Sequence, residues 1–168
     1  YFPSFSGVGR SLNYYPINDE QPEDGVAEIA VGLGKYIVDG GLSLRFSPRH
    51  ADKVLQTSTL DLALRDTQTR FYALDMNKIE QDFNVDDSFN ISKKKIQDFA
   101  STGALKYMVS TFDYVDQMLR DYEYGDGRRV VTFANILQHK VYPLAPCVDF
   151  MLTTGQREMC RPIEIEFA

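Results

Sequence analysis

Two glutamates near the end of the chain, Glu164 and Glu166, are the residues whose type and spacing most suggest chemistry. They alternate with Ile165 and Phe167 in "RPIEIEFA", residues 161–168, and this alternation predicts a β-strand. Residues two apart on a strand leave the same face, so the two carboxylates would lie about 6–7 Å apart. Such a pair suits Mg²⁺, which one or two carboxylates usually hold together with substrate phosphates. The alternative is an amphipathic strand with a solvated acidic face.

A second candidate is the glycine segment "GLGK", residues 32–35. A loop of backbone N–H groups can bind an anion. However, the segment matches neither the GxxxxGK[ST] pattern of phosphate loops nor the GxGxxG pattern of dinucleotide loops. Gly32 and Gly34 therefore predict either an anion-binding loop or a plain glycine turn.

Other residues with chemical potential are scattered along the sequence. Arg10, Arg45 and Arg49 could each reach a polyphosphate, although single arginines near turns are common. His50 and His139 are far apart and neither has a triad-like context of Ser, Cys or Asp. We expect both histidines to be surface or hydrogen-bonded residues rather than catalysts.

The composition excludes several classes of protein. A net charge of −6 argues against a nucleic-acid partner, and the basic run Lys93–Lys95 is expected to be a solvated helix face. Cys147 and Cys160 lack CxxC or Cys/His spacing, which favours reduced thiols in a cytoplasmic protein over a zinc site. No run of 18 apolar residues and no signal peptide are present, so we expect no membrane partner. The missing initiator Met suggests a fragment.

The first half of the sequence predicts short strands and turns. Residues 3–16 indicate a strand or hairpin arm, and 18–25 an acidic loop. "VAEIAVGLG", 26–34, is compatible with a strand or a short helix, and "KYIVDGG", 35–41, is β-rich before a Gly-Gly turn. A possible short helix then precedes a strand at 69–75.

The second half adds helices to these strands. Ser92 is the expected N-cap of a helix "KKKIQDFA", and a turn "DYEYGDG" separates two antiparallel strands at 104–116 and 128–137. Apolar spacing predicts a helix over 143–159, with a proline in its first turn, before the final strand. The expected fold class is α+β, a mixed and mostly antiparallel sheet with packed helices.

Three segments in order resemble the ATP-binding domain of phosphoenolpyruvate synthase and pyruvate phosphate dikinase. They are "SGV", 6–8, "GLGKYIVDGG", 32–41, and "RPIEIEFA", 161–168. The resemblance is specific in the combination and in the last motif, and it covers the two ends of the chain. Residues 50–140 match no part of the family and could be an elaboration within one domain, 1–168.

The resemblance implies an ATP-grasp nucleotide-binding fold in which Glu164 and Glu166 bind the Mg²⁺ that bridges ATP phosphates. It also places four residues near those phosphates, on a weaker match to the family's motifs: Gly32, Gly34, Lys35 and Arg10. In the family, ATP phosphorylates a histidine on a separate domain, and that histidine phosphorylates pyruvate to give phosphoenolpyruvate. Glu164 stands where the family more often has Asp, and Phe167 stands where it usually has Trp. Neither difference removes a carboxylate from the motif.

Other parts of the family's site would lie outside this sequence. The phosphate-binding Lys and Arg of the family would precede Tyr1, and a further polar ligand would follow Ala168. We therefore expect the C-terminal part of an ATP-grasp domain, without catalytic residues of its own and inactive in isolation. One alternative is a non-catalytic nucleotide-binding or interaction module derived from this fold. Another is an α+β domain whose acids face solvent, far from the glycines.

Overall fold

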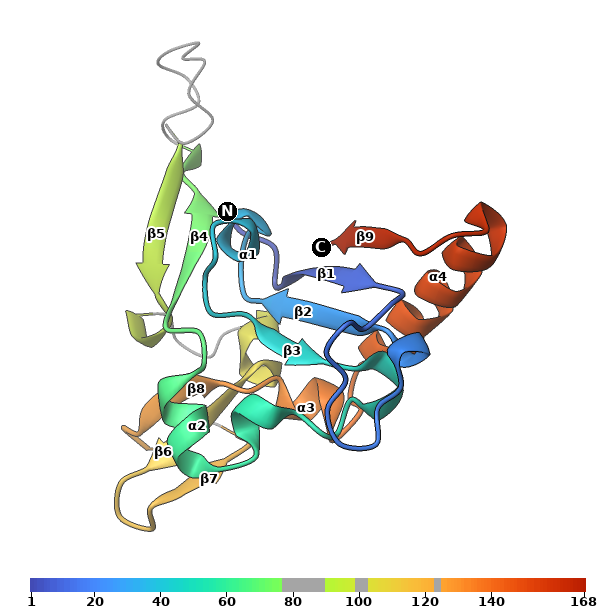
Figure 1. Cartoon of the computed structure of the whole chain (residues 1–168). Coiled ribbons are helices and arrows are strands. Elements are labelled where there is room, and N and C mark those ends of the chain that lie inside the picture. The colour runs from blue at the N-terminus through green and yellow to red at the C-terminus, as the bar shows by residue number, and fades with distance from the viewer. Residues whose placement is uncertain (77–89, 99–102, 123–124) are drawn as a thin grey trace.

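A four-stranded antiparallel sheet forms the centre of the computed structural model, which describes residues 1–76, 90–98, 103–122 and 125–168. Figure 1 shows the strand order β3-β2-β1-β9. The strands are β1 (Ser6–Arg10), β2 (Val26–Ala30), β3 (Leu44–Phe46) and β9 (Glu164–Phe167). Because β1 pairs with both β2 and β9, the first and last segments of the chain lie side by side.

One face of this sheet is apolar and carries the longest helix, α4 (Leu144–Met159) (Figure 1). Val148 and Leu152 of α4 are buried, and both lie close to the position that a side chain on Gly9 would take. Alternation along the strands sends Ala27 and Ile29 to this buried face. The opposite face therefore receives the charged residues of the same strands.

Gly7 of β1 lies directly opposite Phe167 of β9. A Cβ atom on Gly7 would lie 2.3 Å from the Phe167 ring and 2.8 Å from the carbonyl oxygen of Glu28. Only glycine leaves room for the ring to cross the strand at this point. The first and last motifs of the sequence are thus in direct contact.

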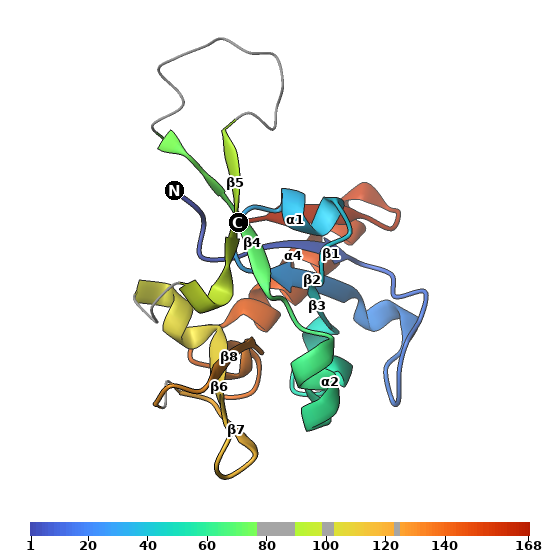
Figure 2. The same cartoon turned by 90° about the vertical axis from the view of Figure 1, so that its left-hand side faces the viewer.

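Two smaller antiparallel sheets come from the middle of the chain. β4 (Arg70–Leu74) and β5 (Ile91–Lys95) form a ribbon that extends away from the rest of the molecule (Figures 1 and 2). The third sheet has the order β7-β6-β8. Its strands are β6 (Val109–Asp113), β7 (Met118–Arg120) and β8 (Arg128–Val131).

Short helices connect these strands. The α-helices are α1 (Lys35–Val38), α2 (Leu60–Arg65) and α3 (Ala134–Leu137). The 3₁₀ turns lie at Pro22–Asp24, Pro48–His50, Leu55–Thr57, Ile96–Asp98 and Gly103–Tyr107. No helix in the described ranges has the length and apolar composition that crossing a bilayer requires.

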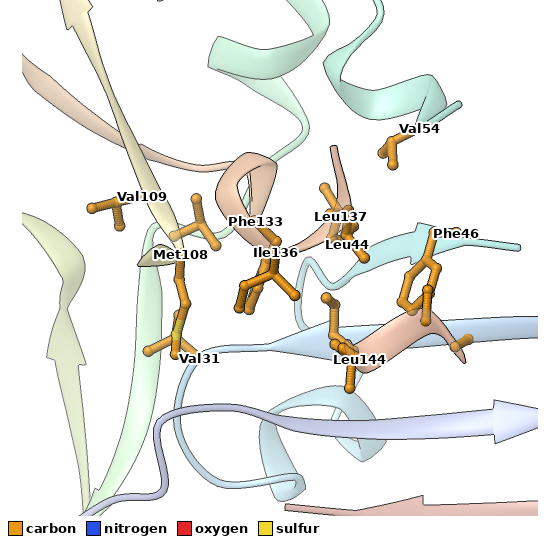
Figure 3. Close-up of a cluster of buried hydrophobic side chains, with 14 of the residues drawn as sticks. Val31, Leu44, Phe46, Val54, Met108, Val109, Phe133, Ile136, Leu137 and Leu144 are labelled. Atoms are coloured by element: carbon orange, nitrogen blue, oxygen red, sulfur yellow. The ribbon is translucent and has the colours of Figure 1, made fainter. Parts of the chain in front are cut away.

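A single cluster of buried side chains joins the central sheet to the middle of the chain. Ile29 and Phe46 of the sheet, Phe71 of the ribbon, and Phe133 before α3 all belong to it and are 1% exposed or less. Figure 3 shows part of this cluster, where side chains from around β2, β3, β6 and α3 meet. The 50–140 region therefore contributes to the same core as the two ends of the chain.

The α+β class with antiparallel sheets is confirmed, as are several of its elements. The helix expected over 143–159 is α4, the strand at 69–75 is β4, and the final strand is β9. "VAEIA" forms a strand, β2. The strands expected at 104–116 and 128–137 exist in part as β6 and β8, which pair antiparallel, and β7, which follows β6 in the sequence, pairs with the other edge of β6. The strand prediction is wrong at both outer ends, where Gly103–Tyr107 forms a 3₁₀ turn and Ala134–Leu137 forms α3.

Two further local predictions are wrong. "KYIV" forms helix α1 instead of a strand, because burial of Tyr36 against Tyr72, with ring centroids 5.6 Å apart, outweighs β propensity. Ser92 and Lys93–Lys95 form strand β5 instead of opening a helix, because β4 supplies a pairing partner. The Nζ of Lys93 lies 5.6 Å from the ring centre of Tyr72. Residues 99–100 of the expected helix lie outside the described residues.

Candidate functional site

A pocket of about 470 Å³ lies between β1, β9 and the start of α1. Its lining comprises Ser6, Gly7, Val8, Leu33, Gly34, Lys35, Val38, Glu166, Phe167 and Ala168. The pocket thus brings one of the two predicted carboxylates, Glu166, together with Gly34 and Lys35 of the glycine segment. These residues lie at opposite ends of the sequence. Strand β1 brings them together because it pairs with β9 on one side and with β2, which leads into the glycine segment, on the other.

The glycine segment is held in place by hydrogen bonds to its backbone. The buried side chain of Gln68 accepts from the Val31 N–H at 2.7 Å and donates to the Val31 carbonyl at 2.9 Å. Ser6 Oγ donates to the Gly32 carbonyl at 2.7 Å. The Leu33 N–H donates to the Tyr72 carbonyl at 3.1 Å. The segment is therefore fixed by residues from β1 and from the start of the ribbon.

The two glycines of the segment have different roles. Gly32 is buried and does not line the pocket. Its φ of +86° is in the left-handed region, and a Cβ there would lie 2.7 Å from the Tyr72 carbonyl oxygen. The backbone angle and the packing around Gly32 therefore require glycine without any contribution from a ligand. Gly34 lines the pocket with a right-handed φ of −58°, and a Cβ on it would make an ordinary contact, 3.5 Å from Ser6 Cβ. Gly34 is thus the glycine that a ligand in the pocket would meet.

Lys35 is the cation of the pocket. Its Nζ lies 3.1 Å from Asp39 Oδ1, one helical turn later, and both side chains are exposed. Exposed pairs of this kind contribute little to stability and are easily exchanged for another anion. Lys35 is therefore available to a ligand at small cost.

Arg10 and Glu164 do not line the pocket, but they lie beside it on the same sheet face as Glu166, opposite each other in the β1–β9 register. Arg10 Nε donates to Glu164 Oε2 at 2.5 Å, and a second guanidinium nitrogen lies 3.5 Å from Glu28 Oε1 on β2. Ser43 Oγ donates to the other oxygen of Glu28 at 2.7 Å. The hydrogen bond with Glu164 raises the pKa of Arg10 above its ordinary value, so the guanidinium remains charged.

The side chain of Glu166 is exposed, and no residue in the described part of the chain pairs with it. Within the described ranges, no three His, Cys, Asp or Glu side chains are grouped to hold a metal ion. Glu164 and Glu166 nevertheless fit Mg²⁺ by their chemistry, since they are hard oxygen donors two residues apart on one exposed face. One or two carboxylates together with phosphate oxygens and waters are its usual ligands.

The other residues considered from sequence also lie outside this pocket, and the arginines and histidines among them contact groups elsewhere in the structure. The Arg45 guanidinium donates to Asn13 Oδ1 and to the Tyr15 carbonyl, and Arg49 bridges Asp24 and Asp149. His50 Nε2 lies 3.1 Å from Asp24, and His139 Nε2 lies 2.9 Å from Asp121. Cys147 and Cys160 are exposed free thiols.

Three residues that support the site were not recognised from sequence: Ser6, Gly7 and Gln68. Ser6 and Gly7 belong to the "SGV" segment, which was noted for its resemblance and without a physical role. Nothing in the sequence around Gln68 distinguishes it from a surface glutamine. A comparison of the chain with protein-family models, curated proteins and solved structures finds no match.

Proposed function

We propose that this chain is the ATP- and Mg²⁺-binding part of a dikinase of the phosphoenolpyruvate synthase type, with an ATP-grasp fold. One observation carries the proposal. The carboxylate of Glu166 lines the same pocket as Gly34 and Lys35, although these residues come from opposite ends of the chain. A nucleotide site needs this combination, because phosphates require both cationic contacts and a metal.

The residues around the pocket have separable tasks in this proposal. Lys35 contributes a positive charge to a bound phosphate, and Gly34 allows the phosphate to approach the backbone closely. Val8, Leu33 and Val38 form the apolar part of the lining, beside the charged groups. Glu164 and Glu166 would hold Mg²⁺, which when bound supplies charge that neutralises phosphate oxygens.

The phosphoryl acceptor in this proposal is a histidine of another domain, which then phosphorylates pyruvate. Neither His50 nor His139 lines the pocket, and each lies within hydrogen-bonding distance of an aspartate elsewhere in the structure. The chain would therefore bind and orient the donor nucleotide without accepting its phosphoryl group.

Calorimetric titration of the purified chain with MgATP tests the proposal directly. Glu166→Gln removes one negative charge from the pocket and should weaken MgATP binding about tenfold or more, since a bond to a charged group contributes about 1.5–3 kcal/mol. The matched control is Glu158→Gln. Glu158 is an exposed residue of α4 that pairs with its neighbour Arg157, so the same chemical change there should leave the affinity unchanged.

Two outcomes would contradict the proposal. One is a wild-type chain that does not bind MgATP at millimolar concentration, and the other is equal affinity in both glutamate variants. For the dikinase reaction itself, Glu164→Gln and Glu166→Gln in the full-length protein should each reduce ATP consumption in the presence of pyruvate. Unchanged consumption in both variants would exclude this reaction.

The alternative is a non-catalytic nucleotide-binding or interaction module, and the hairpin of β6 and β7 favours it. Tyr114 and Val115 at this hairpin are 62% and 89% exposed, and Met118 is 46% exposed. Neighbouring exposed apolar side chains of this kind mark interaction surfaces. This alternative predicts MgATP binding by the chain but no ATP-dependent formation of phosphoenolpyruvate by the full-length protein.

A further inference from the structure

Arg10 occupies the middle of the charged sheet face. It lies on β1, between Glu28 on β2 and Glu164 on β9, and contacts both carboxylates. The register places Glu164 directly opposite Arg10, while Glu28 and Glu166 both lie opposite Val8. Cross-strand partners share a face, and so do residues two apart, so all four charges are on the same side of the sheet.

The carboxylate that Arg10 holds is one of the two that would bind Mg²⁺. Arg45 on β3 lies opposite Glu28 and belongs to the same face, so two guanidinium groups and three carboxylates leave a local charge of about −1, which favours a cation. However, the oxygen Oε2 of Glu164 already accepts the Nε–H of Arg10. A cation that binds through this oxygen of Glu164 therefore competes with Arg10 for it.

We propose that Arg10 is an internal competitor of the metal, which leaves Glu164 when the cation binds and transfers to a phosphate of the nucleotide. This inference rests on the proposed function, because it concerns the order and coupling of ligands at that site. The exchange would give both members of the Arg10–Glu164 pair a new partner: the cation would replace the guanidinium on Glu164, and a phosphate would replace Glu164 on the guanidinium. Arg–phosphate contacts are strong because the planar guanidinium can donate two parallel hydrogen bonds.

The exchange makes the two ligands cooperative. Metal binding alone must displace Arg10 into water, whereas in the presence of nucleotide Arg10 gains a phosphate partner. By linkage, each ligand then raises the affinity for the other by the same factor. The Arg10 side chain is 44% exposed and that of Glu164 is 52% exposed, so the pair is an exposed one. Exposed ion pairs have strengths that correspond to about a two- to fivefold change in cation affinity.

The test measures two affinities in wild type and Arg10→Ala. Mn²⁺ alone is titrated and followed by the EPR signal of the free ion, and MgATP is titrated by calorimetry. Arg10→Ala should bind Mn²⁺ alone about two- to fivefold more tightly, because the competitor is gone. The same variant should bind MgATP about tenfold or more weakly, because a phosphate contact is lost. Opposite signs for the two ligands are the signature of the exchange.

Arg157→Ala is the matched control, since it removes the same charge from an exposed residue of α4 that pairs with its own neighbour, Glu158. It should change neither affinity. Arg10→Lys keeps the charge but lacks the planar fork, and it should give intermediate values for both ligands. Thermal unfolding of each variant confirms that the sheet is intact, and Arg10→Lys decides the question if Arg10→Ala does not fold.

The result that overturns this inference differs from the one that overturns the proposed function. If MgATP binds the wild type but Arg10→Ala leaves Mn²⁺ affinity unchanged or lowers it, Arg10 does not compete with the metal, and the nucleotide site stands. An equal gain in Mn²⁺ affinity in Arg157→Ala would also overturn the inference, because the gain would then reflect the net charge of the protein and not the loss of a competitor. Absence of MgATP binding to the wild type refutes both.

Discussion

Replacement of Gly7 by alanine is expected to destabilise the fold and disturb the pocket together. The new methyl group would lie 2.3 Å from the Phe167 ring, more than 1 Å inside the ordinary contact distance of about 3.5–4.0 Å between carbon atoms. Forced overpacking of this kind costs about 1–3 kcal/mol, while loss of a glycine from the unfolded chain returns about 0.4–1 kcal/mol. We therefore expect a net loss of about 1–2 kcal/mol.

Gly9→Ala is the control, because Gly9 lies on the same strand and faces the same side. A Cβ there would lie 3.3 Å from Ile165 Cγ1 and 3.4 Å from Val148 Cγ1, both side-chain atoms that can shift slightly. Its effect on the free energy of unfolding should be within about 1 kcal/mol. In thermal unfolding, Gly7→Ala should lower Tm by about 2–8 °C, since each kcal/mol shifts Tm by about 2–4 °C at this chain length.

A double-mutant cycle locates the cause of the loss. Phe167→Ala removes the ring, so its cost in the Gly7→Ala background should be smaller than in the wild type. The contact with the Glu28 carbonyl, 2.8 Å from the added Cβ, remains and makes the relief partial. Equal unfolding energies for Gly7→Ala and Gly9→Ala, or strict additivity in the cycle, would refute the assignment of Gly7 to the crossing of the Phe167 ring.

Two further changes probe the pocket, and a third probes an aspartate elsewhere in the fold. Gln68→Ala leaves the buried N–H and carbonyl of Val31 without the Gln68 side chain as their partner. Urea unfolding should therefore show a loss of about 2–4 kcal/mol in the free energy of unfolding, whereas the same substitution of an exposed glutamine would cost less than about 0.5 kcal/mol. Lys35→Ala should weaken MgATP binding about tenfold in calorimetry. Because the side chain is exposed, the same change should alter the free energy of unfolding by less than about 0.5 kcal/mol. A destabilised variant that still binds MgATP with wild-type affinity would contradict the role of Lys35 as a phosphate contact. The pKa of Asp24 is lowered in the folded protein, chiefly by a hydrogen bond from the backbone N–H of Gln21. The ionised Asp24 therefore stabilises the fold at pH values above the ordinary pKa of an aspartate, and this stabilisation is lost as the pH falls through the lowered pKa of the folded state. Asp24→Asn should therefore reduce the fall in Tm between pH 5 and pH 2, and an unchanged pH profile would contradict this.

Sequence patterns predicted the elements whose signal is long or regular. The spacing of Leu144, Val148 and Leu152 identified α4, and the alternation around Glu164 identified β9. Glu166 and the glycine segment, which line one pocket, were both selected from their residue types. These signals are local, so the sequence alone is enough to read them.

The errors lie where a distant partner decides the structure. Helix α1 has only four residues, and its β-rich composition is outweighed by packing of Tyr36 on a strand that comes much later in the chain. The three lysines of β5 are compatible with a helix, and only the pairing with β4 makes them a strand. Gln68 could not be recognised for the same reason, since its partner Val31 is 37 residues away.

The pairing of β1 with β9 also determines when the pocket can exist. Arg10 and Glu164 are separated by 154 positions, so the sheet must close a loop that contains nearly the whole chain. The entropy of closing a flexible loop grows only slowly with its length, so the finished sheet is little destabilised, but contacts so distant form late during folding. A ribosome-bound chain can form the glycine bend early, and it acquires the acidic half of the pocket only after Glu164 and Glu166 have been synthesised.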